Sequence, residues 1–167
     1  MNWFASITAS WPDMEVYRLA REPYARTLSG IGAALKGGRW NSPGTELIYS
    51  AINRSLAMAE VAVHFSLAML PDDYRMVSIH IPDELSMEEW NEEDLPLGWK
   101  EFPHPESTRK MGDAWVLQRR SALLKVPSAV TRGDHNILIN PFHQDFQQIS
   151  ITAVEPFPFD HRLFGVR

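Results

Sequence analysis

Lys36-Gly37-Gly38-Arg39-Trp40-Asn41-Ser42-Pro43-Gly44 sets three glycines and a proline around one arginine, one tryptophan, one asparagine and one serine. Glycine lets the backbone reach positive φ and lets a ligand approach it closely. An arginine and a tryptophan held in such a loop offer a fixed cation and a flat aromatic face. The stretch therefore predicts a binding site for an anionic ligand that carries a ring. A tight turn followed by a core tryptophan is the alternative.

A short strand and a helix are predicted on the C-terminal side of this loop. Residues 46–50, Glu-Leu-Ile-Tyr-Ser, have the composition of a strand. Asn53 or Ser55 can then cap the N-terminus of a helix that runs to about residue 70. The glycine-rich loop is thus expected to lead directly into regular structure.

An acidic residue interrupts the apolar stripe of this helix. Leu56, Glu60, Val63 and Leu67 follow the spacing i, i+4, i+7, i+11, so they share one helical face. A carboxylate there must be hydrogen-bonded, paired or neutralised, because unpaired burial is costly. Buried carboxylates cluster at active sites, which makes Glu60 a candidate catalytic residue. An i,i+4 contact with His64 at the edge of the stripe is the alternative.

Five further strands and a second helix are predicted from the pattern of apolar residues. The strands cover residues 14–19, 75–81, 127–130, 136–141 and 149–154. In the first of them, Val16 and Arg18 share one face, whereas Tyr17 and Leu19 share the other. The second helix is predicted from residue 114 to about 125, with Asp113 as its cap.

Two segments lack a strong pattern. Residues 21–36 are polar and rich in small side chains, which indicates a loop with one weak helical turn. Residues 82–105 are acidic and contain prolines, which indicates an exposed excursion attached to the body by Trp90, Trp99 and Phe102. No repeat or linker divides the chain. We therefore predict one α/β (α+β) domain over residues 1–167, with helices flanking a mixed, twisted sheet.

The overall composition excludes several functional classes. The chain has 167 residues, a formal net charge of −5 and no run of lysine or arginine, which argues against general affinity for nucleic acid. It has no cysteine, which excludes disulfides, thiolate nucleophiles and thiolate-bound zinc. The N-terminal residues lack the pattern of a secretory signal, and no apolar window is long enough to span a bilayer. We expect a cytoplasmic protein.

Common catalytic motifs are also missing from the sequence. There is no Walker A spacing, no Gly-x-Gly-x-x-Gly after a strand and no His-Glu-x-x-His. There is no Gly-x-Ser-x-Gly elbow for a hydrolase serine. The six histidines show no tight metal-ligand spacing, so we expect no metal site and no bound cofactor.

Separated polar residues on apolar elements remain as candidates: Arg18, Arg39, Tyr49, Glu60, Ser128 and Asn140. Two guanidinium groups can hold a pyrophosphate with forked hydrogen bonds. Aromatic rings can stack on a nucleobase or nicotinamide ring. A carboxylate can stabilise a ribosyl oxocarbenium ion. This set suits cleavage of a nicotinamide–ribose bond, which needs little proton transfer because the leaving group is already good.

The sequence resembles the RES domain family, which is named for an arginine, a glutamate and a serine. The resemblance runs from about residue 16 to 163 and is carried by these stretches: Tyr17-Arg18, Gly38-Arg39-Trp40-Asn41, Tyr49, Ser55 to Glu60, Val126-Pro127-Ser128-Ala129-Val130, Asn136-Ile137-Leu138-Ile139-Asn140-Pro141, and the ending from Phe157 to Leu163. The family arginine matches Arg18 or Arg39, its glutamate Glu60 and its serine Ser128. Residues 131–135 depart from the family, which has an acidic residue after Pro-Ser-Ala-Val.

The resemblance implies a toxin of a type II toxin–antitoxin pair with a fold similar to ADP-ribosyltransferases. Members of the family deplete NAD+ by hydrolysis or phosphorolysis, causing growth arrest. An Xre-type antitoxin carries the DNA-binding domain and covers the active site, so the toxin is expected in a hetero-oligomer that contacts DNA only through the antitoxin. Transfer of ADP-ribose to a cellular protein is one alternative activity. A non-catalytic binding module is another.

In the leading hypothesis, each candidate residue has a role on NAD+. Arg18 and Arg39 hold the pyrophosphate, and Tyr49 borders the nicotinamide ribose. Glu60 stabilises the charge at the anomeric carbon or binds the ribose hydroxyls, and Ser128 contacts the nicotinamide end or positions the acceptor. Three further residues are candidate substrate contacts: Trp40, Asn41 and Asn140. Core support is the alternative for Trp40, and a turn before Pro141 is the alternative for Asn140.

Overall fold

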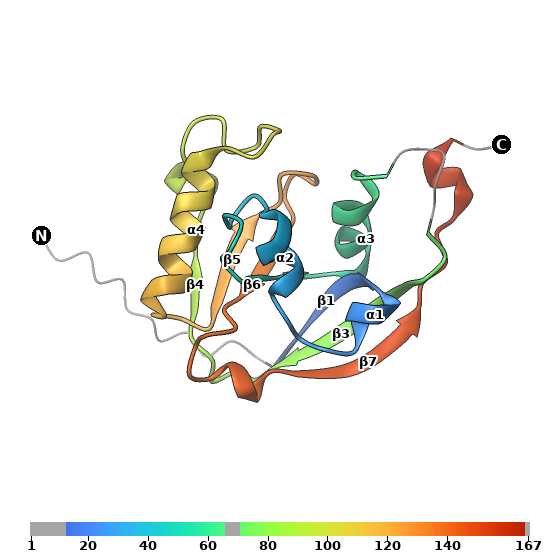
Figure 1. The fold of residues 1–167 in the computed structure, drawn as a ribbon, viewed down its shortest axis with the longest axis horizontal. Coiled ribbons are helices and arrows are strands. Elements are labelled where there is room, and N and C mark those ends of the chain that lie inside the picture. The colour runs from blue at the N-terminus through green and yellow to red at the C-terminus, as the bar shows by residue number, and fades with distance from the viewer. Residues whose placement is uncertain (1–12, 66–70, 166–167) are drawn as a thin grey trace, which may run out of the picture.

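One twisted sheet organises the computed structural model, which describes residues 13–65 and 71–165 (Figure 1). In this part of the chain the sheet has seven strands in the order β4-β5-β6-β2-β1-β3-β7. Their bounds are β1 (Met14–Arg21), β2 (Ile48–Ala51), β3 (Tyr74–Ile81), β4 (Met87–Glu89), β5 (Leu123–Pro127), β6 (His135–Ile139) and β7 (Ser150–Pro156). The β4–β5 pair is parallel and every other pair is antiparallel. The prediction of a mixed, twisted sheet in an α+β domain is confirmed.

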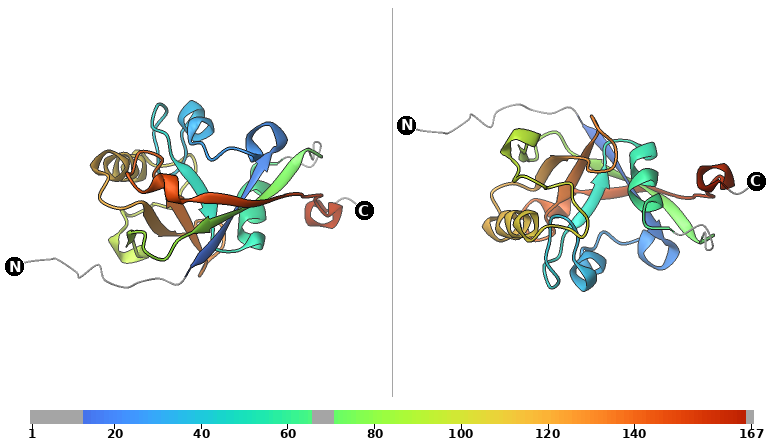
Figure 2. Two further views of the ribbon diagram at one scale, coloured as in Figure 1. Left: turned by 90° about the horizontal axis from the view of Figure 1, so that it is seen from below. Right: turned by 90° about the horizontal axis from the view of Figure 1, so that it is seen from above.

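Four α-helices and three short 3₁₀ helices accompany the described strands. The α-helices are α1 (Glu22–Ala25), α2 (Ile31–Lys36), α3 (Arg54–Ala62) and α4 (Glu106–Gln118). The 3₁₀ helices are η1 (Glu92–Asp94), η2 (Phe146–Gln148) and η3 (His161–Phe164). In the view from above, β6 lies between α4 and α3, which flank it to left and right (Figure 2, right). No helix in the described ranges is long and apolar enough to cross a membrane.

The two faces of the sheet bury different residues, as the alternation along β1 predicts. Val16 packs in a core with Ile48, Val77 and Ile137. Leu19, on the opposite face, packs in a second core that includes Leu56 and Ala57 of α3. Because successive side chains of a strand point to opposite faces, Tyr17 shares the face of Leu19, and Arg18 shares the face of Val16.

Helix α4 covers the same sheet face as α3. Its Trp115 packs with Leu124 of β5 and Leu138 of β6. Leu138 is paired with both Leu124 and Tyr49, and directly paired residues point to the same face. Tyr49 therefore lies on the face that α4 covers. Ala51, two residues further along β2, lies on the same face and packs in the α3 core. This face, between the two helices, holds the candidate functional site.

Helix α3 starts where the sequence predicts and ends earlier. The Asn53 side chain caps it by accepting a 2.7 Å hydrogen bond from the Leu56 N–H. The N–H groups of His64 and Phe65 bond to carbonyls three residues back, a tight turn that ends the helix after Ala62. Val63 is consequently 59% exposed, so its place in the predicted apolar stripe is wrong. Leu67 and the predicted end near residue 70 lie outside the described residues.

The prediction for the second helix and the following strand is wrong in position. Helix α4 begins after Pro105 and ends at Gln118, and the residue that caps its C-terminus, Arg119, has a left-handed φ of 51°. Asp113 lies inside the helix and accepts a 2.9 Å hydrogen bond from the Ser42 N–H, so it is not a cap. Residues 123–127 then form β5, and residues 128–134 form a loop where a strand was predicted at 127–130. The apolar residues 122–124 were interpreted with helical spacing, although they enter a buried strand.

The acidic excursion contains a strand that the sequence did not predict. Strand β4 pairs with β5 at the edge of the sheet, and its acidic residues are neutralised by Arg120 on Glu88 and by Lys125 on Glu89. Trp99 is buried as predicted. Phe102 is 74% exposed, so the prediction that it attaches this segment to the body is wrong.

Candidate functional site

A carboxylate, a hydroxyl and an amide from three separate segments meet on the sheet face between α3 and α4. Glu60 lies in α3, Ser128 directly follows β5, and Asn136 lies in β6. The Ser128 hydroxyl and the Asn136 side-chain amide each donate a 2.7 Å hydrogen bond to Oε1 of Glu60. Oε2 of Glu60 has no hydrogen-bond partner among the described residues. Glu60 itself is half-buried.

Ser128 is itself fixed by the loop that it begins. Its buried Oγ accepts hydrogen bonds from the N–H groups of Val130 (3.1 Å) and Thr131 (3.0 Å). The single hydroxyl proton is therefore directed to Glu60. This geometry makes Ser128 a residue that positions the carboxylate. The predicted alternative, a contact between Glu60 and His64, is wrong, because Glu60 bonds to Ser128 and Asn136 and His64 is exposed.

Arg39 lies within the electrostatic influence of this carboxylate. Its Nη1 donates to the backbone carbonyls of Trp99 and Glu101. Burial lowers the pKa of Arg39, and the negative charge of Glu60 opposes that shift. In the described part of the chain Arg39 forms no ion pair, so its positive charge is not neutralised by a carboxylate at contact distance.

Tyr49, Trp40 and Asn41 build the frame that holds this arginine. The Tyr49 hydroxyl donates to Oδ1 of Asn41 (2.7 Å) and accepts from the Trp40 N–H (3.0 Å). Burial raises the pKa of Tyr49, which keeps the hydroxyl protonated. The fully buried Asn41 donates 2.9 Å hydrogen bonds to the carbonyls of Ala33 in α2 and Thr45 in the loop before β2. The glycine at Gly38 is required by this packing, because a Cβ there would lie 2.5 Å from the Tyr49 hydroxyl oxygen.

Trp40 is buried in the core and does not line an open surface. Its ring packs against Trp90 at 5.7 Å and Trp99 at 6.1 Å between centroids. Helix α4 presses on its backbone at Gly112, where a Cβ would lie 1.7 Å from the Trp40 carbonyl oxygen. For Trp40 the geometry matches the alternative of core support.

Two other predicted contacts lie apart from Glu60. Arg18 donates a 3.3 Å hydrogen bond to the Ser29 carbonyl, and burial lowers its pKa. Among residues 13–65 and 71–165, no hydrogen bond or ion pair joins Arg18 to Glu60, Ser128 or Arg39. Asn140 is fully buried, donates to the Val116 carbonyl and accepts from the Phe142 N–H, each at 3.0 Å. Its geometry matches the alternative of a turn before Pro141.

The structure adds three residues that the sequence analysis did not select: Asn136, Arg109 and His104. Asn136 was recognised only as a strand residue. Arg109 donates a 3.1 Å hydrogen bond from Nε to the Gly38 carbonyl, next to Arg39. His104 has a buried Nδ1 without a partner in the described structure, and burial followed by the charges of nearby arginines lowers its pKa to about 4. Arg109 was missed because the second helix was predicted to begin at residue 114, whereas α4 begins at Glu106.

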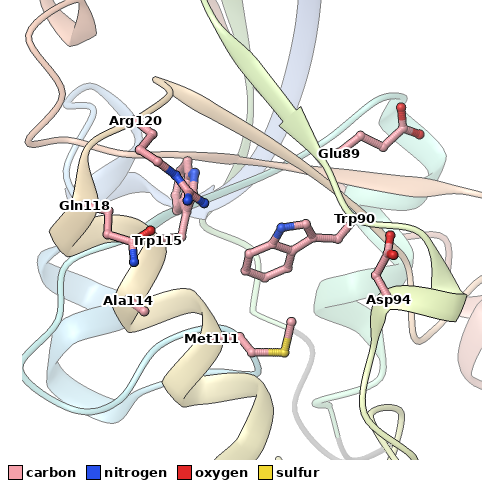
Figure 3. Close-up of a pocket in the computed structure, with 8 residues that line it drawn as sticks. All are labelled: Glu89, Trp90, Asp94, Met111, Ala114, Trp115, Gln118 and Arg120. Atoms are coloured by element: carbon pink, nitrogen blue, oxygen red, sulfur yellow. The ribbon is translucent and has the colours of Figure 1, made fainter. Parts of the chain in front are cut away.

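A groove of about 510 Å³ lies elsewhere, between α4 and the segment of β4 and η1. Trp90 projects toward Met111 and Ala114 of the helix (Figure 3), and Glu89 and Arg120 are also among the residues that line the groove. None of the predicted site residues lines this groove. Within the described ranges, no group of three or more histidine, aspartate or glutamate side chains is placed to hold a metal ion.

Comparisons with known proteins agree on one family. The RES domain model matches residues 15–160. The Prs ADP-ribosylating toxin of Sphingobium sp. (strain YBL2) is 38% identical over 146 residues, covering 86% of this chain and 91% of that protein. A Toxin Res of Yersinia enterocolitica is 37% identical over 153 residues, covering 90% and 99%. The fold is similar to a chain of the crystal structure of the M. tuberculosis MbcT-MbcA toxin–antitoxin complex, with a TM-score of 0.69 at 20% identity, covering 93% of this chain and 88% of that one.

Proposed function

The chain belongs to the RES domain family, and we propose that it is the toxin of a toxin–antitoxin pair that cleaves the nicotinamide–ribose bond of NAD+. The observation that carries this proposal is the half-buried carboxylate of Glu60, which Ser128 and Asn136 hold through one oxygen, while the other oxygen has no hydrogen-bond partner among the described residues. The two named toxins at 37% and 38% identity support the assignment to a toxin.

Glu60 supplies the charge that the reaction needs. When the bond between C1′ and the nicotinamide nitrogen breaks, its electron pair stays on the nitrogen and neutralises the pyridinium ring. Positive charge then develops on C1′ and the ribose ring oxygen. A carboxylate that is already oriented by Ser128 and Asn136 stabilises this charge without having to reorganise. The free Oε2 can face C1′ or accept a hydrogen bond from a ribose hydroxyl.

Arg39 supports the same reaction from the other end of the site. Its partly buried guanidinium lies in the field of Glu60, and two backbone carbonyls hold one of its terminal nitrogens. A guanidinium forms forked hydrogen bonds to phosphate oxygens. Arg39 therefore binds the diphosphate while Glu60 acts at the ribose. Arg18 is the weaker candidate for the diphosphate, because it shares the sheet face of Val16, opposite the face that holds Glu60, and donates to the Ser29 carbonyl.

Three acceptors complete the reaction in different ways. Water attacks C1′ and loses a proton, which gives ADP-ribose. Phosphate attacks C1′ and gives a phosphorylated ADP-ribose. A side chain of a target protein attacks C1′ and becomes ADP-ribosylated. The third outcome is favoured by one observation, namely that a relative at 38% identity is named an ADP-ribosylating toxin.

The proposed partner is an antitoxin of the Xre type that covers the site and carries the DNA-binding domain. The neighbouring fold comes from a toxin–antitoxin complex, which supports a protein partner of this kind. The net charge of −5 suits a toxin that reaches DNA only through its antitoxin.

The activity is tested by incubating the purified protein with NAD+, with and without phosphate, and measuring released nicotinamide. Release in both conditions supports hydrolysis, and a phosphate-dependent rate supports phosphorolysis. NAD+ labelled on the adenine side, added to a lysate, would mark a discrete protein band if ADP-ribose is transferred. No nicotinamide and no labelled band would contradict catalysis. Toxicity that survives the combined loss of Arg39 and Glu60 would favour the non-catalytic binding module.

A further inference from the structure

Arg39 and Arg109 come from distant segments, and each donates to backbone carbonyls of the segment that contains the other. Arg109, in the first turn of α4, donates from Nε to the carbonyl of Gly38, the residue before Arg39. Arg39 in turn donates to the carbonyls of Trp99 and Glu101, in the segment that leads into α4. The loop at 38–39 thus holds the guanidinium group of Arg109, and the segment at 99–101 holds that of Arg39.

Neither arginine is neutralised by an acidic side chain. In the described ranges neither forms an ion pair, although most other arginines there do. Each is anchored through only one of its guanidinium nitrogens, so the others have no hydrogen-bond partner in the described structure. A guanidinium donates five hydrogen bonds in a planar fork that matches phosphate oxygens. Each of the two guanidinium groups therefore has a positive charge without an ion-pair partner and further N–H groups that can donate to a ligand.

His104 lies in the same electrostatic neighbourhood and has an unused ring nitrogen. Its Nδ1 is buried without a partner among the described residues, and buried polar atoms without partners are uncommon in folded proteins. Burial, and then the charges of Arg39, Arg109 and His64, lower the pKa of His104. A bound anion would reverse this repulsion and supply a partner.

The N-terminus of α4 adds a partial positive charge near His104. The helix has 13 residues, begins at Glu106, two residues after His104, and has no side-chain cap on its first N–H groups. The N-terminal end of a helix carries a partial positive charge that favours anions.

We propose that Arg39, Arg109 and His104 form an anion site for the diphosphate of a nucleotide, with Arg109 as the second arginine. This assignment rests on the proposed action on NAD+, and it replaces Arg18 in the predicted pair of arginines. Two forks from separate segments suit two linked phosphates, since each guanidinium can hold one phosphate. The adjacent Glu60 then faces the ribose that follows the diphosphate.

The site is tested with ADP-ribose, ADP and inorganic phosphate as separate probes in calorimetric titrations of the full chain. We expect ADP-ribose and ADP to bind, and inorganic phosphate to bind far more weakly. Arg109→Gln removes a charge-assisted contact, so it should weaken ADP-ribose binding about tenfold. It should also raise the KM for NAD+ with little change in kcat. The matched control is Lys110→Gln, because Lys110 is exposed on the same helix and pairs only with Glu106.

A second variant keeps the test decisive if Arg109→Gln folds poorly. His104→Phe removes a ring nitrogen that has no hydrogen bond in the described structure, so the fold should tolerate it. It should weaken ADP-ribose binding severalfold, and Arg109→Lys should retain more affinity than Arg109→Gln. Affinities for ADP-ribose within twofold of the parent in both His104→Phe and a folded Arg109 variant would overturn the site. Tight binding of inorganic phosphate alone would overturn the assignment to a diphosphate.

The two proposals fail in different ways. ADP-ribose binding that depends on Arg109, without nicotinamide release from NAD+, would leave the anion site standing and contradict the proposed reaction. Nicotinamide release with unchanged KM and ADP-ribose affinity in the two variants would support the reaction and contradict the anion site.

Discussion

The hydroxyl of Ser128 donates a 2.7 Å hydrogen bond to Oε1 of Glu60, although the two residues are 68 positions apart in the chain. Two backbone N–H groups bond to the same hydroxyl oxygen, so its proton has one direction to point. The contact joins the end of β5 to α3 across the sheet face. Through this contact Oε1 of Glu60 is held in place by the protein, and Oε2 is left to interact with a ligand.

Because only one oxygen of Glu60 is held by Ser128 and Asn136, a substitution can remove the negative charge and keep these two hydrogen bonds. Glu60→Gln keeps an oxygen that accepts from Ser128 and Asn136, so the fold should persist. Loss of the negative charge should lower nicotinamide release by about 10² to 10³-fold, the scale of a lost electrostatic contact to a transition state. Glu155→Gln is the control, because Glu155 is an exposed residue paired with Arg54. Full activity in Glu60→Gln would remove this residue from the mechanism.

Ser128→Ala should reduce both stability and turnover. The substitution leaves the N–H groups of Val130 and Thr131 without their acceptor and removes one donor from Glu60. We expect unfolding in urea to become easier by about 1–3 kcal/mol, the cost of unsatisfied buried polar groups. Turnover should fall more than the affinity for NAD+. In a double-mutant cycle with Asn136→Ala, the effects on turnover should not add, because both residues hold one oxygen. Strict additivity would contradict a shared positioning role.

Sequence patterns predict the sheet and select Glu60 as a candidate residue. They do not predict the contacts that α4 makes with the glycine-rich loop. Alternation along β1 predicted correctly that Val16 and Leu19 face opposite cores. Glu60 was predicted to need partners from its spacing after Leu56, and the structure supplies two, although Val63 of the same predicted stripe is exposed. These are local signals with a fixed period, so they survive without knowledge of the tertiary fold.

Long-range contacts account for what was missed. Asp113 has the composition of a helix cap, yet it sits inside α4 and accepts from Ser42, 71 residues away. Arg109 meets Gly38 only because α4 packs against the loop there, and no local pattern encodes that packing. Trp40 and Asn41 carry binding chemistry in sequence, but the fold buries them as support for Arg39.

Gly38→Ala should damage the placement of Arg39. An added Cβ would lie 2.5 Å from the Tyr49 hydroxyl and 3.0 Å from Oδ1 of Asn41, so the frame must shift. We expect a loss of about 1–3 kcal/mol in the free energy of unfolding, as for other overpacked sites. The affinity for ADP-ribose should fall with it. Gly32→Ala is the control, since a Cβ there meets nothing within 4 Å. Equal effects of the two substitutions on stability and ADP-ribose affinity would contradict the role of this close approach.

The last prediction concerns His104 and the dependence of stability on pH. Burial and the charges of Arg39, Arg109 and His64 lower the pKa of His104 from 6.5 to about 4. Between these values the unfolded chain binds a proton at this histidine and the folded chain does not. The contribution of His104 to stability is therefore complete above pH 6.5 and decreases as the pH falls toward 4.

His104→Gln has no such group, so its free energy of unfolding should fall less than that of the parent between pH 6.5 and pH 4. Urea unfolding across this range measures the difference, and His161→Gln, at an exposed position, is the control. A bound diphosphate favours the protonated imidazole, so saturating ADP should raise the pKa of His104 and reduce the same loss of stability. Parallel curves for the parent and His104→Gln would show that this histidine is not held neutral by its surroundings.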